Sequence, residues 1–272
     1  MSRERVEFLE LPAVPLYPFP LASGEVGSRS AILSSEQATK AETRLVKIAP
    51  YWYWEPSVPW ATDLEILVLD GALLLDDWEV SKGGHLYLPA GTPVKSITSL
   101  IGSTIVWMVN PWNSATTDPT PKYIANICDL PWVPVPDFEG RTASEAGSGL
   151  RYKMIHQDPV TTAYTLLSHM AAGWFDPRLE AHETWEELIL LEGDFLMGLA
   201  GQVTGGTYIF RTGEEPHGPQ ATRKGAVWFA RGNKQIDFVF SETAVAKNQT
   251  ELYLKETEGS HQDKVKPWGG WT

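Results

Sequence analysis

Four side chains in the second half of the chain have the chemistry and the spacing of a metal site: Glu180, His182, Glu186 and His217. The first three are two and four residues apart, so on an extended strand their side chains point to one face. His217 follows on a later segment, after Gly213. Two imidazoles with one or two carboxylates suit Fe(II), Mn(II), Ni(II) or Zn(II), and two histidines with one carboxylate leave coordination positions open for a substrate or O2. The pattern therefore predicts a working metal site.

An internal repeat shows where this pattern lies, because the sequence matches itself at an offset of 122 residues. The matched pairs include Trp52 and Trp174, Thr62 and Thr184, Glu65 and Glu187, Leu69 and Leu191, and Leu74 and Leu196. All four glycines between residues 52 and 95 fall on glycines of the second copy. Since glycine marks places where the backbone needs positive φ or close approach, shared glycines indicate shared turns. The repeat therefore indicates a duplicated structure.

The two copies differ at the metal-site positions. The places of Glu180, His182, Glu186 and His217 are taken in the first copy by Val58, Trp60, Leu64 and Lys95. We therefore expect one metal ion per chain, bound in the second copy. In the first copy, Val58, Trp60 and Leu64 are expected to fill the corresponding space with apolar side chains, so that its role is packing and dimerisation.

The segments between the glycines predict short β-strands. Residues 65–75 and 187–197 are apolar runs broken by Asp-Gly or Glu-Gly, the composition of a strand, turn, strand unit. Further strands are predicted at residues 83–91, 103–110, 205–213 and 225–232. No segment longer than about ten residues has a clean 3.6-residue apolar period. The sequence therefore predicts an all-β fold of two packed barrels with little helix.

This organisation divides the chain into three parts. Residues 1–118 are expected to form a barrel with a degenerate metal site, and residues 119–254 a metal-binding barrel. Residues 113–121, rich in Ser, Thr, Asp and Pro, are the expected linker between the copies. The polar segment 255–272 is expected to be an arm or a disordered tail.

The metal pattern resembles the motifs of the cupin family. Residues 180–186, EAHETWE, followed by six residues and Gly193, look like the first cupin motif, HxHxxxE, six residues and Gly. Residues 211–217, RTGEEPH, resemble the second motif, PxGxxH, with Arg for Pro and one extra residue. The His-Gly-Pro ending at 217–219 is similar to cupins of the ChrR anti-sigma-factor type. The match spans roughly residues 160–240. A weaker match, without the metal ligands, spans residues 43–110.

The resemblance implies a tandem pair of cupin barrels, a bicupin, in which His182, Glu186 and His217 bind the metal ion. Glu180 stands where the first cupin histidine is usual, so it either ligates the metal or acts as a base. His169 is a further candidate for the base. Four aromatic residues are expected to form the walls of the substrate site: Trp185, Tyr208, Phe210 and Trp228.

Composition excludes several classes of partner. With 34 acidic and 22 basic residues the net charge is −12, so nucleic acid and anionic membranes are poor partners. There is no apolar signal-peptide core and no 18-residue apolar run, so we expect a soluble cytoplasmic protein. Cys128 is the single cysteine, which leaves no internal disulfide. We expect a homodimer that acts on a small molecule.

Three functions are compatible with these observations. The first is a non-haem Fe(II) dioxygenase that cleaves a carbon–carbon bond in a dicarbonyl, enol or phenolic substrate. The second is a redox-neutral isomerase, hydrolase or decarboxylase, for which Zn, Mn or Ni would also serve. The third is a ChrR-like sensory module without catalysis. Because the whole chain consists of cupin-like copies and has no appended helical domain, the sensory module is the least favoured of the three. We favour the Fe(II) dioxygenase.

Overall fold

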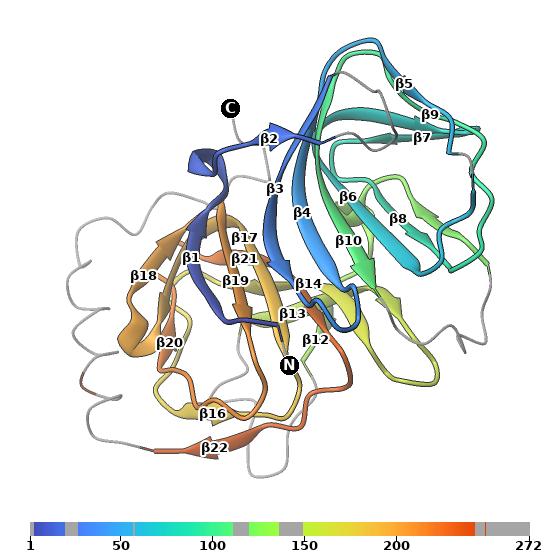
Figure 1. Ribbon diagram of the computed structural model, residues 1–272. Coiled ribbons are helices and arrows are strands. Elements are labelled where there is room, and N and C mark those ends of the chain that lie inside the picture. Colours follow the sequence, from blue (N-terminus) through green and yellow to red (C-terminus); the bar gives the residue numbers. More distant parts are fainter. Residues whose placement is uncertain are drawn as a thin grey trace.

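The protein is almost entirely β-structure, as predicted, and consists of two curved sheets packed side by side (Figure 1). The computed structural model describes residues 3–19, 27–56, 58–110, 120–135, 149–242 and 248. Most of the predicted linker and the whole of the predicted tail 255–272 lie outside these residues. Among the described residues, no helix has the length and apolar character needed to span a bilayer.

Each sheet has ten strands, and all the described strand pairs are antiparallel. The first sheet contains β2 (Tyr17–Pro18), β3 (Ser28–Ser35), β4 (Glu42–Ile48), β5 (Trp52–Trp54), β6 (Asp63–Leu75), β7 (Trp78–Ser81), β8 (His85–Leu88), β9 (Ile97–Ser99), β10 (Ser103–Asn110) and β11 (Lys122–Ile124). The second contains β1 (Val6–Glu10), β12 (Val133–Pro134), β13 (Leu150–Gln157), β14 (Tyr164–Met170), β15 (Phe175–Asp176), β17 (Glu186–Met197), β18 (Gln202–Thr204), β19 (Thr207–Arg211), β20 (Gln220–Ala221) and β21 (Ala226–Gly232). A separate pair is formed by β16 (Leu179–Ala181) and β22 (Val239–Ser241). Short 3-10 turns are η1 (Leu11–Ala13), η2 (Ile127–Asp129) and η4 (Gly198–Ala200).

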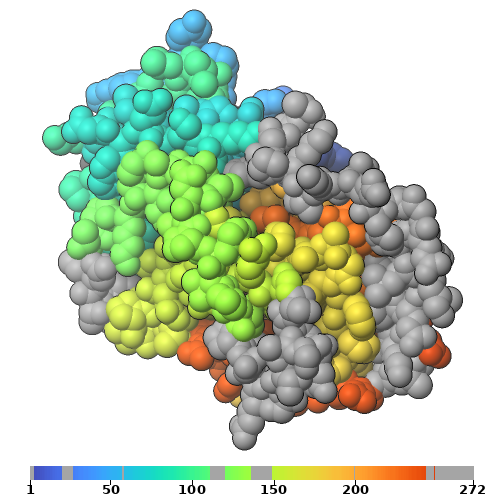
Figure 2. Space-filling view, turned by 180° about the vertical axis from the view of Figure 1, so that it is seen from behind, coloured from blue at the N-terminus to red at the C-terminus, as the bar shows by residue number. Residues whose placement is uncertain are grey.

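The two sheets have the same topology and exchange their edge strands. The main order is β11-β8-β6-β10-β4-β3-β2 in the first and β1-β19-β17-β21-β14-β13-β12 in the second. Strand β1, blue in Figure 1, therefore pairs with β19 of the second copy, and β11 pairs with β8 of the first. From behind, residues 120–135 lie in light green across the junction of the two halves (Figure 2). The domain bounds 1–118 and 119–254 stay a prediction. However, β1 and β11 each pair with a strand that lies on the other side of this division of the sequence.

The Asp-Gly and Glu-Gly pairs do not make turns, so that part of the prediction was wrong. Strands β6 and β17 continue through Gly71 and Gly193, and a register shift lies two residues before each glycine, at Leu69 and Leu191. Gly193 has a φ of +90°, and a Cβ there would lie 1.8 Å from the Gly225 carbonyl oxygen. Only glycine fits this positive φ and close approach, which follow directly after the β-bulge at Leu191. The bulge bends one long strand so that its two halves pair with different neighbours.

The apolar core has three parts: one inside each barrel and one between the two barrels. The layer between them combines leucines of the first sheet, such as Leu67, with Ile189, Tyr208, Phe210 and Phe229 of the second. These residues alternate along their strands with residues of the barrel interiors. The two barrels therefore share a buried interface made of their sheet faces.

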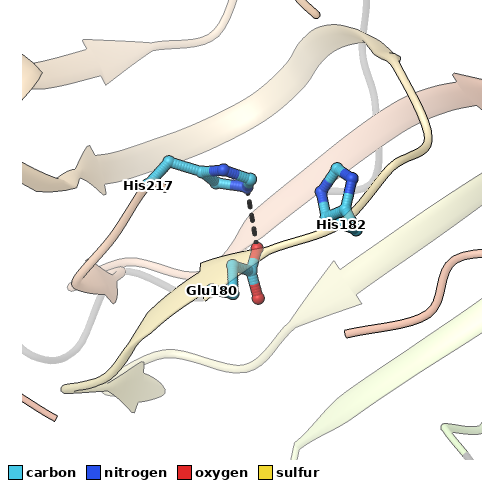
Figure 3. A group of neighbouring side chains, drawn as sticks. All are labelled: Glu180, His182 and His217. Atoms are coloured by element: carbon cyan, nitrogen blue, oxygen red, sulfur yellow. Dashed lines mark ion pairs between the residues drawn. The ribbon is translucent and has the colours of Figure 1, made fainter. Parts of the chain in front are cut away.

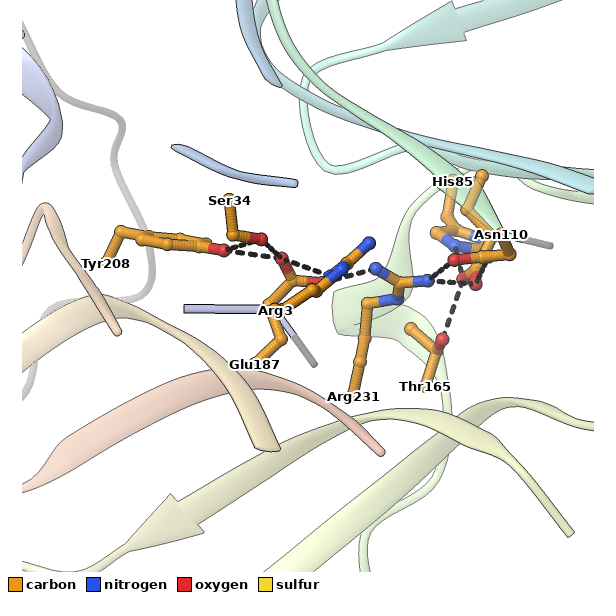
Figure 4. A network of polar contacts seen from close by, with 9 residues as sticks. Arg3, Ser34, His85, Asn110, Thr165, Glu187, Tyr208 and Arg231 are labelled. Carbon is orange, nitrogen blue, oxygen red and sulfur yellow. Dashed lines mark hydrogen bonds and ion pairs between the residues drawn. The ribbon is translucent and has the colours of Figure 1, made fainter. Parts of the chain in front are cut away.

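A buried ionic network crosses that interface (Figure 4). Arg231 forms ion pairs with Glu65 of the first sheet, at 3.1 Å, and with Glu187 of the second. Tyr208 donates a hydrogen bond to Glu187, and Thr165 donates one to Glu65. Burial opposes ionisation of Glu187, but the guanidinium of Arg231 lowers the pKa of its carboxyl below the ordinary value. The repeated glutamates are thus scaffold residues.

The space in the first barrel is filled only in part as predicted. Leu64 is fully buried, and Trp60 packs against the same core. Val58, however, is 71% exposed, so the prediction that it fills the interior was wrong. Lys95 is also exposed.

Truncating Leu64 is expected to destabilise the protein. Leu64→Ala removes a fully buried side chain and should lower the free energy of unfolding by about 2–5 kcal/mol. Val58→Ala is the control and should change it by less than about 0.5 kcal/mol, because Val58 is exposed. Urea titrations measure both. Equal stabilities of the two variants would contradict a packing role for Leu64.

Candidate metal centre

The metal candidates come from three segments that meet at one end of the second barrel. Glu180 lies on β16, His182 follows it, and Glu186 begins β17. His217 lies before β20 and is joined to Glu180 by two backbone hydrogen bonds, of 2.8 and 2.9 Å. The backbone thereby fixes the relative positions of two of the four side chains.

The side chains of Glu180, His182 and His217 converge (Figure 3). They do not share one extended strand as the spacing predicts, because residues 182–185 form a bend between β16 and β17. Ligand atoms of Glu180, His182 and His217 all lie within 4.8 Å of one another. His217 Nε2 is 3.0 Å from Glu180 Oε1, and Glu186 Oε2 is 3.4 and 3.6 Å from Nε2 of His182 and His217. Ligand atoms about 2.1 Å from one ion lie about 3.0 Å apart in octahedral and about 3.4 Å apart in tetrahedral coordination. The separations suit a shared metal ion.

Backbone carbonyls fix the tautomer of both histidines. Nδ1 of His182 donates to the Thr184 carbonyl at 2.7 Å, and Nδ1 of His217 donates to the Glu215 carbonyl at 2.9 Å. Each Nε2 is buried: His182 Nε2 contacts Glu186, and His217 Nε2 contacts Glu180 and Glu186. Apart from these contacts, neither Nε2 has a hydrogen-bond partner among the described residues. Metal-binding histidines have this arrangement, in which one ring nitrogen is held by a backbone carbonyl and the other binds the metal ion in exchange for its proton. The residues present therefore fit a divalent ion.

The electrostatics of the site favour a cation. Burial opposes the charge on Glu186, but His182, His217 and Arg211 lower its pKa to about 2. Burial likewise lowers the pKa of His182, but the carboxylates of Glu186 and Glu180 outweigh it and raise that pKa to about 9. Arg211 lies opposite Glu186 on β19 and binds Glu7 at 3.1 Å. The ionised carboxylate of Glu186 thus faces the position between the imidazoles, with the carboxyl group of Glu180 3.0 Å from His217 Nε2.

A cavity of about 390 Å³ opens beside these residues. Its polar lining includes Glu180, Glu186, His217, Gln220, Gln157, Gln235, Ser168, Tyr152 and Tyr164, and the rest is apolar, with Met154, Met170, Met197, Leu166, Leu188, Trp174, Phe195, Trp228 and Phe238. The volume falls in the range of small-molecule sites. His182 is not part of this lining, since its ring packs between His217 and Phe238.

Only one of the four predicted substrate-binding aromatic residues lies at the cavity. Trp228 lines it, whereas Tyr208 and Phe210 belong to the layer between the barrels. Trp185 packs against Phe210 at 5.5 Å. The structure does not line the cavity with these three: Tyr208 and Phe210 share the face of β19 opposite the barrel interior, and Trp185 packs against that same layer.

His169 does not reach the candidate site either. Its neighbours on β14, Ser168 and Met170, line the cavity, so His169 projects from the other face of the strand. There it contacts the ring of Trp132 at 5.4 Å and a nitrogen of Arg151 at 3.5 Å. The geometry gives no support for His169 as the base, whereas Glu180 lines the cavity.

Two polar residues of the site were missed in the sequence. Gln220 donates a hydrogen bond to Glu180. Tyr164 lines the cavity, and burial raises the pKa of its phenol, with further increases from the charges of Glu186 and Glu180. Neither residue lies in a motif, so only the strand pairing places them here.

Comparisons with known proteins agree with this fold. The sequence matches the family described as Domain of unknown function (DUF4437) over residues 14–239. No curated protein matches it. Similar solved structures include a candidate dioxygenase from Nostoc punctiforme, with 19% identity, a TM-score of 0.71 and coverage of 89% of this chain and 87% of that chain.

Two other similar structures belong to different groups. Protein Ylba from E. coli, of the DUF861 family, has 13% identity and a TM-score of 0.59, with 85% and 92% of the chains covered. A variant of oxalate decarboxylase from Bacillus subtilis has 11% identity and a TM-score of 0.50, with 87% and 79% covered. Identities this low show a shared fold alone, which is the cupin β-barrel. Since the family match covers most of the sequence, this two-barrel cupin chain belongs to the DUF4437 family.

Proposed function

We propose that this chain is a metal-dependent cupin enzyme that binds one divalent ion in its second barrel through His182, Glu186 and His217. The observation that carries this proposal is the pair of buried Nε2 atoms, each held by a backbone carbonyl on the opposite nitrogen and facing two carboxylates. The adjoining apolar cavity provides room for a small organic molecule. A homodimer and a cytoplasmic location stay predictions.

For the reaction we propose oxygen-dependent cleavage of a carbon–carbon bond in a small dicarbonyl, enol or phenolic compound, with Fe(II) as the metal. When bound, Fe(II) would supply the redox chemistry that activates O2 and would polarise a substrate oxygen. The apolar walls would hold the body of the substrate and exclude water. Glu180, at the cavity wall and hydrogen-bonded by Gln220, is placed to accept a proton from an enol or phenol.

A redox-neutral isomerase, hydrolase or decarboxylase is the second candidate. The same position of Glu180 favours it, because a carboxylate beside a Lewis-acidic metal can move a proton without any oxidant. The ChrR-like sensory module is the third candidate and would bind metal without turnover.

One experiment separates these candidates. Protein purified without oxygen is analysed for metals, and its O2 uptake is then screened with dicarbonyl and phenolic compounds. We expect about one equivalent of iron and uptake with at least one compound. Bound metal with no O2 uptake, but with conversion of a compound, would favour the redox-neutral enzyme. Protein without tightly bound metal after loading would contradict the proposed function.

Changing Glu180 to glutamine distinguishes a role of Glu180 as a metal ligand from a role as a general base. We expect Glu180→Gln to retain its metal and to lose about 10²- to 10⁴-fold in rate with the substrate found in that screen, because His182, Glu186 and His217 suffice as ligands. A ligand role would instead weaken metal binding about 10-fold or more, with activity partly restored by excess metal.

The matched control is Glu183→Gln, in the same loop, whose side chain is 72% exposed and paired with Lys234. This variant should keep wild-type metal content and rate. Full metal and full activity in Glu180→Gln would remove Glu180 from the site.

A further inference from the structure

A buried hydroxyl in the cavity has no hydrogen-bond partner in the part of the chain that the structure describes. Tyr164 begins β14, is only 7% exposed, and lines the cavity. Its phenolic oxygen is buried and makes no hydrogen bond. Leaving such a group unpaired costs free energy, so an unpaired buried hydroxyl in a cavity indicates a ligand that satisfies it.

The strand register directs this hydroxyl toward the metal candidates. Tyr164 lies opposite Gly232 on β21, and Gly232 lies opposite Glu186 on β17. The three residues are thus in line across three adjacent strands. The Tyr164 ring packs directly on Gly232 and occupies the space that a side chain at position 232 would need. A Cβ at this position would lie 2.6 Å from Cε1 of Tyr164 and 2.7 Å from its hydroxyl oxygen. Glycine at 232 lets the phenol extend across β21 toward Glu186.

The other groups in the cavity limit the kind of ligand. The lining contains the carboxylates of Glu180 and Glu186, and among its described residues there is no lysine or arginine. A dicarboxylate would find no cationic side chain to pair with its charges. An uncharged molecule with an apolar body fits the methionine, leucine and aromatic walls. A phenol remains protonated near neutral pH, so Tyr164 acts as a donor.

We propose that Tyr164 is a positioning residue, whose hydroxyl donates a hydrogen bond to the oxygen of an uncharged, otherwise apolar ligand in this cavity. The inference deepens the proposed function and rests on it for the role of the ligand, which is the substrate. The hydrogen bond aligns the oxygen beside Glu180 and the metal candidates, while the walls hold the rest of the molecule.

Calorimetric titration with 4-methylphenol and with toluene tests this inference on zinc-loaded and metal-free protein. The two probes differ by one hydroxyl. We expect Tyr164→Phe to weaken 4-methylphenol binding about 3- to 10-fold, as for one lost hydrogen bond, and to leave toluene binding unchanged. Gly232→Ala, which displaces the ring, should also weaken 4-methylphenol binding. Tyr208→Phe is the control, because its buried hydroxyl faces Glu187 instead of the cavity, and it should bind both probes like the wild type.

Three results would overturn the inference: wild-type protein that does not bind 4-methylphenol, unchanged binding in Tyr164→Phe, or equal losses for both probes. Metal content is measured on each sample. Wild-type protein that takes up zinc but gives one of these results leaves the proposed function standing and the role of Tyr164 wrong. Wild-type protein that takes up no zinc contradicts the proposed function, and the metal-free titrations still decide whether Tyr164 binds the oxygen.

Discussion

Replacing both His182 and His217 with alanine is expected to abolish metal binding. Wild-type protein should carry about one equivalent after loading, and the double variant less than about 0.1. The reason is the loss of both imidazoles: weakening an outer partner of one ligand already costs about 10- to 100-fold in affinity, and losing two ligands costs more. Plasma mass spectrometry after gel filtration measures the metal, and circular dichroism checks that the variant is folded.

The matched control is His169→Ala. His169 is also a histidine of the second barrel, but it projects from the opposite face of β14 and contacts Trp132 and Arg151. It should keep about one equivalent of metal. Retention of metal by the double variant, or two tightly held equivalents in the wild type, would contradict a single site in the second barrel.

Replacing Arg231 with methionine is expected to cost about 3–5 kcal/mol in the free energy of unfolding, the cost of breaking a buried ion pair. Arg231 is 1% exposed and lies between Glu65 and Glu187, both of which are also buried. Without it, two carboxylates remain close together in the interface between the barrels. Guanidinium chloride titrations measure the loss.

Two comparisons make this prediction specific. Lys234→Met removes an exposed ion pair with Glu183 and should cost less than about 1 kcal/mol. The triple variant Arg231→Met, Glu65→Gln, Glu187→Gln should recover part of the loss, because it removes both carboxylates that Arg231 neutralises, although Arg3 then loses its 3.5 Å ion pair with Glu187. A stability of Arg231→Met within about 0.5 kcal/mol of the wild type would show that the network does not hold the barrels together.

The sequence alone was sufficient for the features that depend on residues close together in the chain. Glycines 122 residues apart revealed the duplication, and the spacing of Glu180, His182 and Glu186 marked them as one group of candidate ligands. The single extended strand predicted for them was wrong, because residues 182–185 separate β16 from β17. Substitution of Val58, Trp60, Leu64 and Lys95 at the equivalent positions assigned the metal candidates to the second copy. Local periodicity and spacing carry this information because strand geometry repeats every two residues.

The tertiary structure decided which face of each strand is the interior. Tyr208 and Phe210 alternate with Ile209, and only the packing of the second barrel on the first places those two aromatic rings in the shared layer and Ile209 inside the barrel. The same alternation separates His169 from the cavity.

Pairings between strands that are distant in the chain also could not be predicted from the sequence. Strand β1 pairs with β19 about two hundred residues away, and Tyr164 is in line with Glu186 only because β21 places Gly232 between β14 and β17. No pattern within a strand specifies its partner strand. The partner is selected by the burial of whole sheet faces, to which residues from the entire chain contribute.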